Sequence, residues 1–235
     1  MSSPLARAER NFAEQALVST HQALSHGTRV ALLAEAIDAL LARHAGAGRN
    51  GALQCVDVGC GDFSLSGSIR ERGQARGSTQ DWCGLDLYPL DEVRAADPAW
   101  DGYRQFDGAA IPLPDASVDV VLMCDMLHHA SPGQQVSLAQ EAARVCRDVV
   151  IVKDHFEYGP VSRQMLRLMD AVGNWGYGVS VPDRYFDVES FAGWASSGGL
   201  TEIERVTGIE LYRKLGPLQQ ILRPEWQFLS VLRRA

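Results

Sequence analysis

The sequence has no apolar stretch long enough to cross a membrane, and its N-terminus lacks the cationic and then apolar pattern of a secretion signal. It also has no long run of basic residues, because its 22 lysines and arginines are scattered and are outnumbered by 29 aspartates and glutamates. The resulting formal net charge of -7 disfavours binding to the phosphate backbone of a nucleic acid. We therefore predict a cytoplasmic protein, monomeric or homodimeric, whose partners include neither membranes nor nucleic acids.

Cysteine pairs of the C-x-x-C type are also missing. Five cysteines are scattered along the chain, and four of them lie in or beside apolar runs, where a free cysteine acts as a small hydrophobic residue. They are Cys55, Cys60, Cys83, Cys124 and Cys146. This pattern argues against a disulfide framework or a zinc site built from cysteines, and it fits a reducing compartment.

The chain does contain a regular alternation of two kinds of segment. Short, almost continuously apolar segments alternate with segments whose apolar residues recur at helical spacing. We predict strands at 52–58, 82–87, 103–106, 118–124, 149–153, 202–207 and 226–232, and helices at 5–24, 28–44, 64–72, 133–146 and 188–197. Apolar strands joined by helices are typical of a parallel sheet that is covered on both faces. The predicted fold class is therefore α/β, a Rossmann-like three-layer sandwich.

The domain organisation follows from where this alternation begins and where it is interrupted. Residues 1–50 should form an N-terminal helical cap, and residues 51–155 the cofactor-binding core. Residues 156–187 contain a helix-like piece and then a segment rich in glycine and aromatic residues, which is typical of a functional lid over an active site. Residues 188–235 should complete the core.

Ligands of open α/β sheets bind at the carboxyl ends of the strands, so the strand ends are the places to look for chemistry. In the first of them, VDVGCGDF at 56–63, Gly59 and Gly61 allow a tight turn and a close approach of the backbone to a ligand. The third glycine of a dinucleotide-binding turn is replaced by Phe63, which favours a smaller cofactor. Asp57 could accept a hydrogen bond from an ammonium group or could instead hold the amides of the turn.

The next two strand ends carry further acidic residues. Asp86, in GLDLYP at 84–89, could accept both hydroxyls of a ribose, or it could form a turn. Asp107 and Gly108 follow the third strand and could recognise an adenine amino group. These positions predict an adenosine-containing cofactor.

Together, VDVGCGDF, GLDLYP and FDGAAIPLPDASVDVVLMCDMLHH resemble the class I S-adenosylmethionine-dependent methyltransferases. The resemblance is to the small-molecule branch that includes the ubiquinone and menaquinone methyltransferases, and it covers about residues 52–153. It implies a seven-stranded, mostly parallel sheet whose last strand is antiparallel, and S-adenosylmethionine as the cofactor, released as S-adenosylhomocysteine. The cofactor-binding residues that it implies are Asp57, Gly59, Cys60, Gly61, Asp86, Leu87, Asp107, Gly108 and Cys124.

Methyl transfer to an acceptor mainly requires alignment and exclusion of water, and a hydroxyl acceptor also benefits from a base. His155 is our first candidate for this base and His129 the second, since both should face the cleft and histidine titrates in a useful range. The residues predicted to bind the small-molecule acceptor are Asp125, His128, Asp154, Trp175, Tyr177 and Tyr185. The alternative for each is an ordinary structural role in packing or turn formation.

A metal site is not predicted. Asp125 and Asp154 could share a magnesium ion, but the neighbouring ligands are incomplete in the sequence. Two other functions use the same fold: a nicotinamide-dependent or other nucleotide-binding protein, and a binding module without transfer activity. The missing third glycine and the lack of a Y-x-x-x-K hydride-transfer motif argue against the former, and an intact cofactor site with a complete lid argues against the latter.

Overall fold

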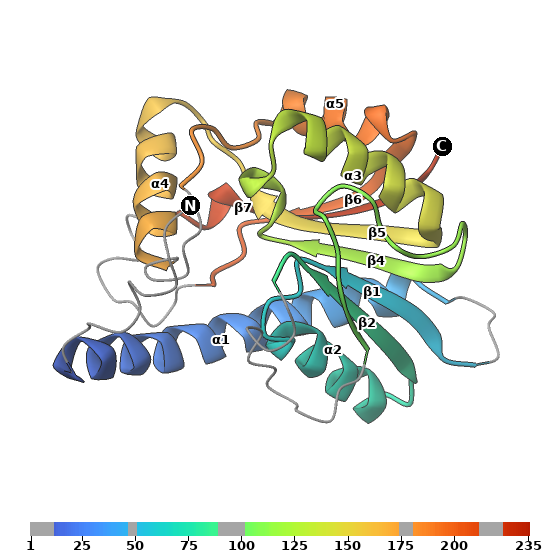
Figure 1. Cartoon of the computed structure of the whole chain (residues 1–235), viewed down its shortest axis with the longest axis horizontal. Coiled ribbons are helices and arrows are strands. Elements are labelled where there is room, and N and C mark those ends of the chain that lie inside the picture. The colour runs from blue at the N-terminus through green and yellow to red at the C-terminus, as the bar shows by residue number, and fades with distance from the viewer. Residues whose placement is uncertain (1–11, 47–50, 89–101, 174–180, 212–222) are drawn as a thin grey trace.

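The computed structural model describes residues 12–46, 51–88, 102–173, 181–211 and 223–235 (Figure 1). The strands are β1 (Leu53–Val58), β2 (Gln80–Asp86), β3 (Tyr103–Gln105), β4 (Val118–Cys124), β5 (Cys146–His155), β6 (Leu200–Thr207) and β7 (Gln227–Arg234). The helices are α1 (Phe12–His44), α2 (Ser64–Ala75), α3 (Pro132–Val145), α4 (Pro160–Gly173) and α5 (Val188–Ser197), with short 3-10 helices η2 (Leu127–His129) and η4 (Pro224–Trp226).

The seven strands form one sheet in the order β3-β2-β1-β4-β5-β7-β6. Neighbouring strands from β3 to β5 are parallel, and β7 is antiparallel to both β5 and β6. The strand order reverses between β1 and β4, which is where α/β sheets of this kind bind their ligands. The predicted fold class and the antiparallel last strand are confirmed.

Helices cover both faces of the sheet (Figure 1). On one face, α1 and α2 pack on the strands through apolar residues such as Ile37, Leu41 and Ile69. On the other face, α3 and α5 pack through residues such as Leu138 and Phe191. The central strand β4 contributes to both cores because its side chains are apolar on both sides, which leaves its carboxyl end as the place for polar groups.

One feature of the prediction was wrong: the two expected N-terminal helices form the single helix α1. The break was expected before residue 28, but Gly27 continues the helix. A glycine inside a helix costs about 1 kcal/mol relative to alanine, which neighbouring packing readily offsets. The other strands and helices lie where they were predicted, apart from shifts at their ends.

The segment between β5 and α5 begins and ends close together, just beyond the carboxyl end of β5. Phe156 and Phe186 form a parallel bridge, and the Glu157 amide donates to the carbonyl of Phe186 at 2.7 Å. Helix α4 lies between these two points and packs through Leu166 against Tyr185. Trp175 and Tyr177, which we predicted to contact the acceptor, lie outside the described residues. Within the described residues, no helix is both long and apolar enough to span a membrane.

Candidate functional site

The turn after β1 is tightly held between two neighbouring strands. Gly59 and Gly61 have φ values of +77° and +54°, which favour glycine. The amides of Gly59 and Cys60 donate to the carbonyl of Leu85 on β2, at 2.8 and 3.1 Å. A Cβ atom at Gly59 would lie 2.9 Å from Cβ of Met126, so the turn also contacts the segment that follows β4.

Asp57 is buried at the end of β1, where it is 2% exposed. The Ser66 hydroxyl donates to its Oδ2 at 2.5 Å. Burial raises the pKa of Asp57 to about 7, although the bond from Ser66 opposes this shift. Within the part of the chain that the structure describes, Asp57 has no cationic partner, and such a buried carboxyl group is suited to accept a hydrogen bond from a ligand ammonium group.

Asp86 holds the glycine turn. Its Oδ2 accepts a hydrogen bond from the Gly61 amide at 2.9 Å, and its Oδ1 accepts one from the Leu87 amide at 2.7 Å. The turn-forming role that the sequence left as an alternative is therefore present. An ionised carboxylate has about four acceptor positions, so these two bonds leave capacity for the hydroxyls of a ribose.

Asp107, Gly108 and Leu87 come together beside β3. Asp107 Oδ1 accepts hydrogen bonds from the amides of Ala109 and Ala110, at 2.9 and 2.8 Å, which hold the turn and lower the pKa of Asp107. Gly108 has a φ of +81°, and a Cβ atom there would lie 2.8 Å from Cδ2 of Leu87. Leu87 is 52% exposed, so an apolar side chain is accessible at this strand end.

Asp125, directly after β4, lies in a buried ionic network. It forms ion pairs with Arg29 of α1 and with Lys153 of β5, whose side chain is fully buried. Burial would raise the pKa of Asp125, but Lys153 and Arg29 outweigh it and hold this pKa well below its usual range. The neighbouring Cys124 thiol lies 3.7 Å from Asp125 Oδ2, and burial raises the pKa of the thiol. Because two cations already neutralise Asp125, the magnesium site that would combine it with Asp154 loses its support.

His128 and Asp154 form a buried pair. The Nδ1–H group of His128 donates to Asp154 Oδ1 at 2.6 Å, and the same oxygen accepts the amide of His155 at 2.7 Å. Asp154 is fully buried, and no described residue forms a hydrogen bond with its Oδ2. Burial would raise the pKa of Asp154, but the neighbouring His128 and His155 lower it.

The two candidate bases lie on either side of His128. His155 is buried, and its Nδ1 lies 3.5 Å from an oxygen of Asp125 and 3.5 Å from an oxygen of Asp154. Burial and the positive charge of Lys153 lower the pKa of His155. His129 is half-buried, and its ring centroid is 4.1 Å from that of His128. The structure thus brings together most of the residues that the sequence predicted to contact the acceptor.

Residues 56–151, less than half of the chain, match a known protein family described as a methyltransferase domain. These residues of the chain therefore form a methyltransferase domain. Its predicted family is thereby confirmed, and S-adenosylmethionine is the cofactor of that family. No curated protein matches the sequence.

Solved structures of methyltransferases have the same fold as this methyltransferase domain. The complex of the Haloferax volcanii Trm112 methyltransferase activator with a methyltransferase matches at a TM-score of 0.63 and 16% identity, covering 96% of this chain and 99% of that one. An S-adenosylmethionine-dependent methyltransferase from Mesorhizobium loti matches at a TM-score of 0.56 and 18% identity, covering 78% of this chain and 92% of that one. The magnesium protoporphyrin IX methyltransferase from Synechocystis, with bound S-adenosylhomocysteine, matches at a TM-score of 0.57 and 14% identity. The match covers 97% of this chain and 90% of that one.

Three residues of the methyltransferase site were missed in the sequence. Arg29 and Lys153 neutralise Asp125, and Asp170 on α4 accepts a hydrogen bond from the Tyr185 hydroxyl. A single lysine inside the apolar strand VVIVK was a signal for Lys153, because a buried lysine requires a partner. Asp170, the acidic residue at the end of the helix-like piece VSRQMLRLMD, was a weaker signal. Nothing in the sequence distinguished Arg29.

Proposed function

We propose that this chain binds S-adenosylmethionine and transfers its methyl group to an oxygen, nitrogen or carbon atom of a small, partly apolar molecule. The observation that carries the proposal is the contact between Gly59 and Met126. In this contact the turn after β1, which we call the cofactor turn, lies against the segment that carries His128 and His129. A cofactor held by the turn would therefore lie beside the polar cluster.

The residues at the ends of β1 and β2 suit the polar groups of this cofactor. Asp57 would accept a hydrogen bond from the ammonium group, and Asp86 would use its remaining acceptor positions for the ribose hydroxyls. Leu87 and Gly108 would contact the adenine ring beside Asp107. When bound, the cofactor supplies an electrophilic methyl group on a positively charged sulfur.

The chain would contribute alignment, a base and exclusion of water. The His155 ring lies beside Asp125 and Asp154, with Nδ1 3.5 Å from an oxygen of each, and this imidazole would accept the proton of the acceptor. General-base catalysis of this kind contributes typically about 10²–10⁴-fold in rate. Helix α4 and Tyr185, in the predicted lid at 156–187, would close over the acceptor and keep water away.

A macromolecular acceptor is the second candidate. Its support is the Haloferax volcanii methyltransferase, which matches nearly the whole chain and is bound to an activator protein. The net charge of -7 favours the small molecule, since a nucleic-acid acceptor would be repelled. Methyl transfer from labelled cofactor to a small-molecule fraction, compared with protein and RNA fractions, distinguishes the two.

The cofactor is tested by calorimetric titration of the full chain with S-adenosylmethionine and S-adenosylhomocysteine, with NADH and NADPH as controls. We expect the adenosyl pair to bind at micromolar concentration and the nicotinamides not to bind. Binding of a nicotinamide alone, or of none of the four, would overturn the proposed function. Once the cofactor is established, acceptors can be screened with and without added metal ions.

A further inference from the structure

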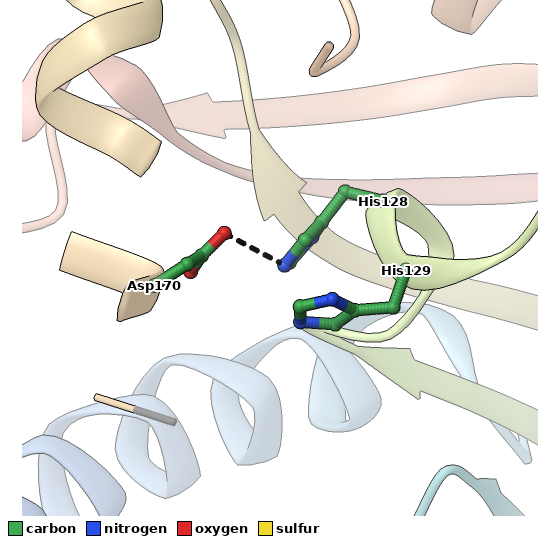
Figure 2. A group of neighbouring side chains, drawn as sticks. All are labelled: His128, His129 and Asp170. Atoms are coloured by element: carbon green, nitrogen blue, oxygen red, sulfur yellow. Dashed lines mark ion pairs between the residues drawn. The ribbon is translucent and has the colours of Figure 1, made fainter. Parts of the chain in front are cut away.

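We propose that His128, His129 and Asp170 form a binding site for a divalent transition-metal ion such as Zn²⁺. One ligand atom from each of these residues lies within 4.8 Å of the other two, so that one ion can reach all three. In Figure 2, Asp170 lies opposite the two histidine rings, which come from the short helix η2. Two imidazoles and one carboxylate suit Zn²⁺, Fe²⁺ or Co²⁺ better than Mg²⁺ or Ca²⁺, which prefer oxygen ligands alone.

The distances between the side chains match ligands of one ion better than direct hydrogen bonds. His128 Nε2 lies 3.6 Å from Asp170 Oδ2, which is too long for a hydrogen bond. Two ligand atoms that are each about 2.0–2.1 Å from a tetrahedral ion lie about 3.4 Å apart. The centroids of the His128 and His129 rings are 4.1 Å apart with an interplanar angle of 49°, so the two rings can present nitrogens to the same point.

The groups behind these ligands fix their orientation. Because His128 donates its Nδ1–H group to Asp154, the nitrogen left to bind an ion is Nε2, which faces Asp170. A carboxylate that holds the far nitrogen of a histidine in this way is the usual support of a metal-binding histidine. Tyr185 donates its hydroxyl to Asp170 Oδ2 and so holds the carboxylate ligand in place.

The charge of the surroundings also favours a cation. Asp154 and Asp170 lie on opposite sides of His128. The cations around them pair with other carboxylates: Arg29 and Lys153 with Asp125, and Arg167 with Asp183. An excess of buried negative charge is unfavourable unless a cation offsets it. An ion bound at Nε2 of His128 would offset the charge of both carboxylates.

A site with three protein ligands leaves coordination positions open, as catalytic metal sites do. This step rests on the proposed function: the open positions would bind an oxygen of the acceptor, from a hydroxyl or a carboxylate, and hold it near His155. The acceptor class would then be an oxygen-bearing metabolite. His129, our second candidate base, would act as a metal ligand instead.

The experiment uses the full chain without an affinity tag, after dialysis against a chelator. It is titrated with Zn²⁺ by calorimetry and with Co²⁺ by visible absorption, which reports the kind of ligand. We expect one equivalent to bind, with the affinity lowered at least about 100-fold in Asp170→Asn and in His129→Gln. Asp154→Asn, which removes only the support of His128, should lower it by about 10–100-fold. His44→Gln is the matched control and should bind as the wild type does, because His44 pairs with Glu204 elsewhere on the protein.

Three results would overturn the metal site: no Zn²⁺ binding by the wild type, equal binding by Asp170→Asn and His129→Gln, or a Co²⁺ spectrum with thiolate ligands. Titration of the same samples with S-adenosylhomocysteine shows that each variant is folded. It also separates the two proposals. A chain that binds S-adenosylhomocysteine but no metal would overturn the metal site alone, and the reverse would overturn the proposed function alone.

Discussion

Phe63 fills the space that Gly84 leaves open on β2. A Cβ atom at Gly84 would lie 1.9 Å from Cε1 of Phe63 and 2.6 Å from its Cζ. Phe63 has a φ of 64°, in the region that favours glycine, yet its ring is 1% exposed and packs edge-on against Tyr103 at 5.7 Å. The departure from the third glycine of a dinucleotide-binding turn is thus accommodated by a glycine on the neighbouring strand.

Replacement of Gly84 by alanine should therefore destabilise the protein. The added methyl group would displace the Phe63 ring, and overpacking of this kind costs about 1–3 kcal/mol in the free energy of unfolding. Chemical denaturation measures this change. Gly67→Ala in α2 is the matched control, because a Cβ atom there would meet nothing within 4 Å, and it should be neutral or stabilising. Similar losses in both variants would contradict the packing argument.

Asp57 should make the protein less stable as the pH rises. Burial raises its pKa from 3.8 to about 7 in the folded state, so between these values the folded protein holds a proton that the unfolded chain has lost. This contribution to stability is complete below about pH 4 and is lost as the pH rises through 7, by up to about 4 kcal/mol. Chemical denaturation at several pH values measures this contribution as the difference in the free energy of unfolding between the wild type and Asp57→Asn. A difference that stays constant from pH 4 to 8 would contradict the raised pKa.

Binding of the cofactor should also change the protonation of Asp57. An ammonium group beside Asp57 would favour its ionised form, so binding at pH 6 should release a proton. Calorimetric titration with S-adenosylhomocysteine in buffers of different ionisation enthalpy measures this proton. Asp57→Asn should weaken binding and abolish the release, whereas equal release by both proteins would assign the proton to another group.

The fold was largely predictable because it depends on local patterns. The apolar strand at 118–124 and the glycines at 59 and 61 specify their own conformations. Arg29 and Asp170 could not be assigned in this way because their partners are distant in the sequence. Arg29 pairs with Asp125, 96 residues away, and Asp170 meets His128 and Tyr185 from two other segments. The sequence thus located the strand ends of the site but not the helical residues that complete it.

Asp86 should be required for cofactor binding. Hydrogen bonds to a charged group contribute about 1.5–3 kcal/mol each, so loss of the ribose contacts in Asp86→Ala should weaken binding of S-adenosylhomocysteine on the order of 100-fold or more. The turn would also lose the acceptor of the Gly61 amide. Asp81→Ala is the control, because Asp81 is an exposed aspartate on the same strand. Unchanged affinity in Asp86→Ala, measured by calorimetry, would overturn the ribose assignment.

His155 should affect transfer and leave cofactor binding intact. Its Nδ1 lies between Asp125 and Asp154 at the carboxyl ends of β4 and β5, and among the described residues none of its polar contacts involves the cofactor turn. With an acceptor in hand, His155→Ala should lower kcat by about 10²–10⁴-fold, and S-adenosylhomocysteine should bind as it does to the wild type. His155→Gln, which preserves more of the buried volume, should be equally slow if the nitrogen acts as a base, and it should recover activity if the ring only fills space. His44→Gln serves as the control for loss of a histidine elsewhere. Loss of S-adenosylhomocysteine binding in both His155 variants would instead give His155 a structural role and contradict its assignment as the base.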